Sequence, residues 1–96
     1  MRVELKKFGT TLISRQSGKE AFSAFQSTLA DIASDEIIEI DFEGVITFSP
    51  SWGDEFLTPL LNRFGDRIIL FPTGNPSVKI TIKLLEEISK RNFRRK

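Results

Sequence analysis

The chain has 96 residues, of which 40% are hydrophobic and 28% are charged, and its formal net charge is +1. This length fits one domain, residues 1–96, with a single core. No apolar run reaches the roughly 20 residues that a membrane span requires. No apolar signal segment follows Met1, so we expect a cytoplasmic protein without membrane contacts.

The residue types that are missing limit the chemistry of the chain. It contains no histidine, no cysteine and no tyrosine. The commonest general base, the commonest nitrogen ligand for metals and all thiolate ligands are therefore absent. We expect a protein that is not an enzyme and that binds no cofactor.

The charges are distributed unevenly along the sequence. Residues 1–30 carry a net charge of +3, residues 31–66 carry −8, and residues 79–96 carry +5. An acidic middle and a basic end indicate oriented contacts with a charged partner. The alternative is that these charges only decorate solvated faces.

The first third of the chain predicts two strands and a helix. Residues 2–7 alternate weakly, Gly9 interrupts them, and residues 10–14 follow as a second strand, which together predict a hairpin. Ser17 and Glu20 have the spacing of a capping box at a helix start. The helix after it has an apolar face, which consists of Phe22, Phe25, Leu29 and Ile32.

Two further strand–helix units follow. Residues 37–42 and 67–71 are apolar strands, and the helix between them ends at Gly65. Pro59 inside that helix predicts a kink, or a break near Thr58. Asn75 and Pro76 open a last helix. Its single broad apolar face is predicted to contain Val78, Thr81, Ile82, Leu84, Leu85 and Ile88.

The predicted fold is therefore an α/β domain with the order β-β-α-β-α-β-α. Parallel strands need helical crossovers, whereas the opening hairpin is antiparallel, so we expect a four-stranded mixed sheet with helices mainly on one face. Residues 90–96 are expected to form a frayed, basic tail.

One stretch carries a family resemblance. The sequence Asp41-Phe42-Glu43-Gly44-Val45, followed after a spacer by Ser51-Trp52-Gly53-Asp54-Glu55-Phe56, resembles the bacterial STAS-like domains, which are related to the anti-sigma-factor antagonists. The resemblance extends more weakly over almost the whole chain. It implies a small regulatory α/β binding module, without a catalytic centre, whose partner is an anti-sigma factor or a kinase-like ATPase domain.

The candidate partner-binding residues surround the start of the second predicted helix. They are Ser49, Ser51, Trp52, Asp54 and Glu55. Loops at the carboxyl ends of strands in open α/β sheets commonly bind ligands and partners. Trp52 is either a partner anchor or part of the core, and the two serines can also be explained as helix caps.

A phosphorylation switch is a further hypothesis for this segment. In the antagonist domains that the chain resembles, the corresponding Asp-Ser-Ser-Gly-Leu is phosphorylated on its first serine. Pro50 falls at that position, so only Ser51 or Ser49 could replace it. Asp54 and Glu55 would repel the added charge. Together with Asp41 these carboxylates could also bind Mg²⁺, but helix capping explains Asp54 and Glu55 without a metal.

The alternative function is that of a nucleic-acid-associated regulatory factor. The basic C-terminus could contact phosphates, and Phe93 could stack on a base. The candidate contacts are Lys90, Arg91, Arg94, Arg95 and Lys96. The turn at residues 73–76 lacks a glycine-rich phosphate-binding pattern and is explained as a plain turn.

Overall fold

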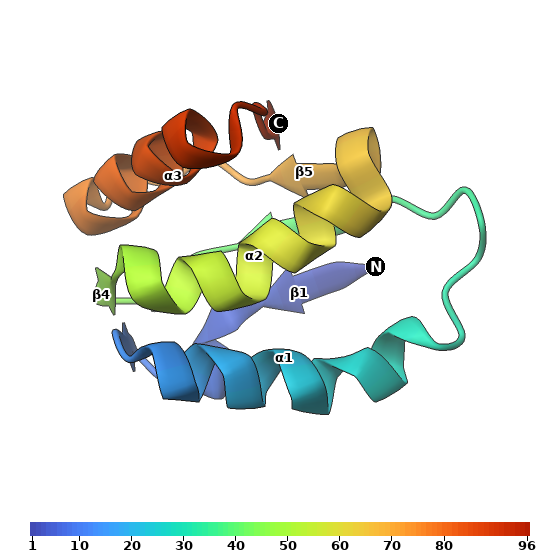
Figure 1. The fold of residues 1–96 in the computed structure, drawn as a ribbon, viewed down its shortest axis with the longest axis horizontal. Coiled ribbons are helices and arrows are strands. Elements are labelled where there is room, and N and C mark those ends of the chain that lie inside the picture. The colour runs from blue at the N-terminus through green and yellow to red at the C-terminus, as the bar shows by residue number, and fades with distance from the viewer.

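The computed structural model describes all 96 residues as one α/β domain with three long helices (Figure 1). In chain order the elements are β1 (Arg2–Glu4), the 3-10 helix η1 (Leu5–Phe8), β2 (Thr11–Leu12), α1 (Arg15–Leu29), β3 (Ile38–Asp41), β4 (Thr47–Phe48), α2 (Pro50–Phe64), the 3-10 helix η2 (Gly65–Arg67), β5 (Ile68–Leu70), α3 (Pro76–Ser89) and β6 (Arg94–Arg95). None of the helices combines the length and the apolar character that crossing a membrane requires.

Every strand pairing in the structure is parallel, so the predicted mixed sheet is wrong. The main sheet has the order β1-β3-β5-β6, and β2 pairs with β4 in a separate two-stranded sheet. The predicted hairpin does not form because residues 5–8 make a 3-10 turn that leads the chain onward. Gly9, with φ of 127°, then redirects the backbone so that β2 meets β4 instead of β1.

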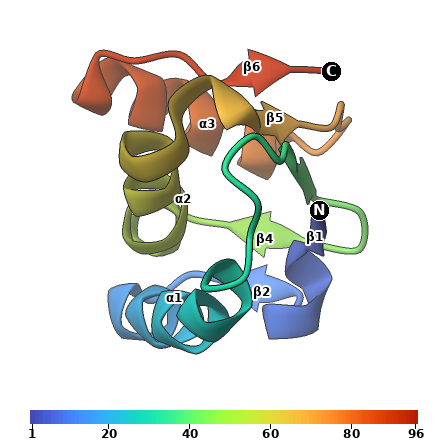
Figure 2. The same ribbon diagram turned by 90° about the vertical axis from the view of Figure 1, so that its right-hand side faces the viewer.

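The three helices lie together on one face of the sheet, as predicted (Figures 1 and 2). α2 packs between α1 and α3. The strand residues that face the helices are buried, and they are Val3, Ile38, Ile40, Ile68 and Leu70. Because side chains alternate along a strand, Arg2, next to Val3, lies on the other face and is exposed. Lys96, which follows β6, is exposed beside it. These two cations lie over the ring of Phe71, at 4.8 and 4.7 Å from its centroid.

Side-chain caps fix the starts of the helices. Ser49 caps α2, and Asn75 caps α3. Each cap is followed directly by a proline at the first position of the helix, as the sequence predicted. The capping box at Ser17 is wrong. The N-cap of α1 is Ser14, whose oxygen accepts a hydrogen bond from the backbone N–H of Ser17, so the helix begins one turn earlier.

α2 continues through Pro59 without a break, which excludes the predicted restart near Thr58. Proline cannot donate to the carbonyl of Glu55, four residues before it, and this normally costs about 3 kcal/mol. Burial of Leu57, Leu60 and other apolar residues on the same helix holds it in place. Gly65, with φ of 55°, ends the helix as expected and donates to the carbonyl of Leu61.

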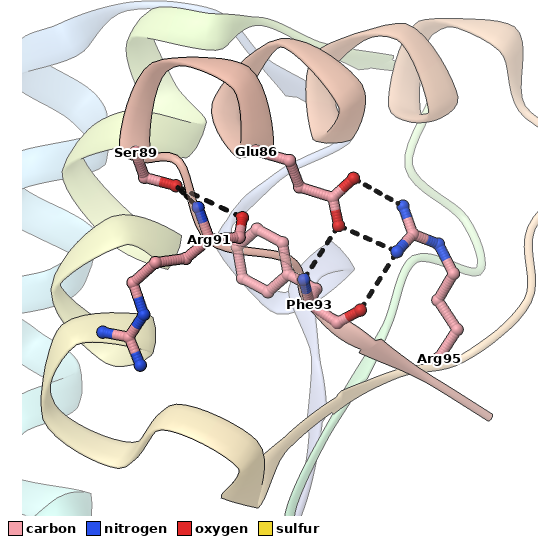
Figure 3. Close-up of polar contacts among 5 residues, drawn as sticks. All are labelled: Glu86, Ser89, Arg91, Phe93 and Arg95. Atoms are coloured by element: carbon pink, nitrogen blue, oxygen red, sulfur yellow. Dashed lines mark hydrogen bonds and ion pairs between the residues drawn. The ribbon is translucent and has the colours of Figure 1, made fainter.

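The C-terminal residues are ordered, so the frayed tail is also wrong. After α3, the chain forms β6, which pairs Arg94 and Arg95 with β5 and completes the main sheet. Phe93 is buried, and its N–H donates to the Glu86 carboxylate at 2.8 Å (Figure 3). Arg95 bonds both oxygens of the same carboxylate, at 2.8 and 3.0 Å.

Candidate interaction surface on the helical layer

The start of α2 is held by the hydroxyl of Ser49. Its oxygen accepts a hydrogen bond from the N–H of Trp52 at 3.3 Å, and its O–H donates to the carbonyl of Ile13 at 2.6 Å. The capping interpretation of Ser49 is therefore confirmed, and the cap also ties α2 to the segment before α1. Ser51 is half-buried in the first turn and makes no side-chain hydrogen bond, so the capping interpretation is wrong for this residue.

Trp52 belongs to the core and offers no surface to a partner. Its exposed fraction is 0%, and its ring stacks on Phe56 with the centroids 5.0 Å apart. The partner-anchor role of Trp52 is therefore excluded in this structure. The ring lies among Phe8, Phe48 and Phe56, and α1 approaches the backbone of Trp52 closely at Gly18.

Asp54 and Glu55 lie at the surface of the helical layer and share one cation. The guanidinium of Arg15, on α1, contacts Asp54 at 3.0 Å and Glu55 at 2.9 Å. The hydrogen bonds that Arg15 donates to Glu55 and then to Asp54 raise the pKa of Arg15. The hydroxyl of Thr58 donates to Asp54 at 3.0 Å. One arginine balances one of the two carboxylates, so this part of the surface keeps a net negative charge.

α3 exposes a stripe of apolar residues that the sequence analysis did not identify. Ile80, Leu84 and Ile88 follow one another at intervals of four residues, and 69%, 36% and 64% of their surfaces are exposed. The sequence placed Leu84 and Ile88 in the core, which is wrong: the buried face of α3 consists of Val78, Thr81, Ile82 and Leu85. The four-residue spacing was the available signal, since a second such row indicates a second apolar face.

The stripe belongs to the same helical layer as the acidic residues of α2. α2 and α3 run side by side in Figure 1. Gly53, at the start of α2, lies so close to Leu85 that a Cβ there would be 2.9 Å from the leucine Cδ1. Leu85 of α3 therefore packs against the first turn of α2.

The C-terminal cations are dispersed, and most are already engaged. Arg94 donates to the carbonyl of Asp66, Arg95 pairs with Glu86, and the Lys96 ammonium lies 3.1 Å from Glu39. Lys90 and Arg91 follow the end of α3 and are exposed, and the Arg91 side chain points away from Glu86 and Arg95 in Figure 3. The stacking role considered for Phe93 is wrong, because its ring is buried.

The three carboxylates considered as a magnesium site do not meet. Asp54 and Glu55 contact Arg15, whereas Asp41 ends β3 and pairs with Arg2. The hydrogen bond from Arg2 lowers the pKa of Asp41, although burial opposes this, and the N–H of Glu43 adds a second bond at 3.0 Å. No group of three or more Asp or Glu side chains is arranged to hold a metal ion.

Comparisons of the chain with protein-family models, with curated proteins and with solved structures found no match.

Proposed function

We propose that the chain is a regulatory module that binds another protein through the surface formed by α2 and α3. The observation that carries the proposal is the exposed stripe of Ile80, Leu84 and Ile88. Isolated exposed apolar residues are common, but a row of three along one helix is typical of an interaction site. An apolar helix face is also a recurring means of protein recognition.

The charge at the start of α2 indicates what the partner presents. Asp54 and Glu55 carry one more negative charge than Arg15 neutralises. A complementary partner has apolar side chains bordered by basic ones, because opposite potentials favour encounter and orientation. The resemblance to STAS-like domains supports a kinase-like ATPase domain or an anti-sigma factor as the partner class. It also supports the regulatory role.

The proposal is tested by capturing partners from a lysate of the native host with the full chain and with surface variants. We expect Leu84→Glu and the double variant Asp54→Arg with Glu55→Arg to lose a partner that the unmodified chain recovers. The loss should be at least tenfold, since central interface residues contribute 2 kcal/mol or more. Trp52→Ala is unsuitable, because removing a buried ring would destabilise the core instead of altering the surface alone.

Gln26→Glu, an exposed position on α1, is the matched control, because it adds the same charge outside the surface. Circular dichroism confirms that each variant is folded. If every recovered protein binds folded Leu84→Glu and the double variant as well as it binds the control, the proposed surface is wrong.

A further inference from the structure

A cavity of about 280 Å³ lies between α3 and the carboxyl end of β5, separate from the helical-layer surface. Its apolar side is formed by buried residues, namely Phe42, Leu70, Val78 and Ile82. These side chains belong to the core, so this side of the cavity is preformed. The carboxyl ends of strands are where open α/β sheets commonly bind ligands.

Cations line the other side of the cavity, and no carboxylate does. They are Lys79, Arg95 and Lys96. Arg95 is paired with Glu86, and Lys96 with Glu39. Lys79 is exposed and has no ion pair or side-chain hydrogen bond in the structure, so its charge is free to pair with a ligand. The carboxylates of Asp41 and Glu43 line a neighbouring depression, which shares Phe71, Pro72, Thr73 and Lys96 with the cavity.

The helix N-terminus beside the cavity is not a phosphate cradle. The side-chain oxygen of Asn75 already accepts from the N–H groups of Ser77 and Val78, at 2.8 and 3.4 Å. The N–H of Lys79 donates to the carbonyl of Asn75 at 3.0 Å. An anion here therefore has to be held by side-chain cations, and the apolar side of the cavity favours an anion that carries a hydrocarbon part.

The cavity also limits the size of its occupant. A water molecule takes about 30 Å³ in the liquid, so about 280 Å³ accommodates roughly ten non-hydrogen atoms. We propose that this cavity binds a small apolar carboxylate, whose hydrocarbon part contacts Leu70 and Ile82 and whose carboxylate pairs with Lys79 and Lys96. This site is independent of the partner surface on α2 and α3.

Octanoate, which has the required size and chemistry, is a suitable probe. Its titration into the ¹⁵N-labelled full chain should shift the amide signals of residues 70, 71, 73, 78–82 and 95–96 in a saturable way. Octanol has the same chain without the charge and should bind at least about tenfold more weakly, because charge-assisted hydrogen bonds contribute 1.5 kcal/mol or more. Inorganic phosphate should not produce these shifts.

Lys79→Met removes the free cation and should weaken octanoate binding about tenfold. Lys83→Met, one turn further along α3 and outside the cavity, is the matched control and should leave binding unchanged. The proposal is overturned if octanoate causes no shifts at these residues up to about 10 mM. It is also overturned if octanol binds equally well, if phosphate alone reproduces the shifts, or if the two lysine variants behave alike.

Discussion

Trp52 shows how a single residue can be central to the fold and still imperfectly accommodated. Its ring packs against Phe56 and Phe48, with centroid distances of 5.0 and 5.8 Å. Its indole N–H, however, is buried without an acceptor. An unpaired buried donor costs about 1–3 kcal/mol, so the packing of the ring has to outweigh that cost.

This balance predicts different results for two substitutions of Trp52. Trp52→Phe removes the unpaired donor, which stabilises the fold, but it also removes part of the ring, which destabilises it. We therefore expect the free energy of unfolding to fall by no more than about 2 kcal/mol. Trp52→Ala leaves a large cavity and should lose about 3–5 kcal/mol. Urea unfolding measures both. Ile46→Ala, at a position that is 67% exposed, should change stability by about 0.5 kcal/mol or less, and an equally small effect of Trp52→Ala would contradict the burial.

Residue-level features were predictable from sequence where a local interaction determines them. Ser49, Gly65 and Asn75 were identified correctly, because a cap depends on a few neighbouring backbone groups. Ser14 was missed in favour of Ser17, since either serine could cap α1. Long-range bonds decide between them: Ser49 binds the carbonyl of Ile13 and so keeps the preceding segment extended as far as Ser14. The burial of Trp52 likewise depends on contacts that sequence does not show.

At the scale of elements, the approach of α1 to α2 depends on Gly18. A Cβ at this position would lie 2.7 Å from the carbonyl oxygen and 3.0 Å from the Cα of Trp52. Both are backbone atoms, so the helices would have to separate. Alanine favours helix by about 1 kcal/mol over glycine, but overpacking typically costs about 1–3 kcal/mol.

We therefore expect Gly18→Ala to lower the free energy of unfolding by about 1–2 kcal/mol, measured in urea. Ser23→Ala, at an exposed position on the same helix, should be neutral or slightly stabilising and serves as the control. An increase in stability for Gly18→Ala, comparable to that of the control, would show that the two helices are not in close contact at this point.

The elements that sequence did not predict are those held by distant partners. β4 lies beside α3, where the hydroxyls of Ser77 and Thr81 both donate to the carbonyl of Phe48. β6 contains only two arginines, which have no β preference, and it forms because Phe93 is buried beside it. The three helices and the strands β3 and β5 were predicted, since they have long periodic or apolar patterns. The parallel arrangement of the first strands was not predicted, because it depends on the 3-10 turn at residues 5–8.

At the scale of the whole molecule, the uneven charge distribution is partly balanced within the fold. Arg2, from the basic first segment, pairs with Asp41 of the acidic middle. Lys96, from the basic end, pairs with Glu39 in the same middle segment. These contacts attach β1 and β6, the two edges of the main sheet, to the central strand β3. Some of the charge that suggested a partner therefore stabilises the sheet and is not available for external contacts.

This internal pairing predicts that acid destabilises the protein, and Glu86 is the residue best suited to test it. Burial raises the pKa of Glu86, but the hydrogen bonds from Arg95 and from the N–H of Phe93 outweigh it, so the net pKa lies below its ordinary value of 4.5. A lowered pKa means that the folded state binds this proton less readily than the unfolded state. The stabilisation that the ionised Glu86 carboxylate contributes is therefore complete above about pH 4.5. It is lost as the pH falls through the lowered pKa of this group.

Glu86→Gln should reduce the dependence of the urea midpoint on pH between about pH 5 and pH 2, because glutamine does not titrate. At neutral pH the variant should be less stable than the unmodified chain, since Arg95 loses its charged partner. Glu87→Gln, at the next and exposed position, is the control and should keep the pH dependence of the unmodified chain. Parallel pH profiles for all three proteins would mean that the C-terminal strand is not held by the Glu86 carboxylate. In that case β6 would depend on the burial of Phe93 alone.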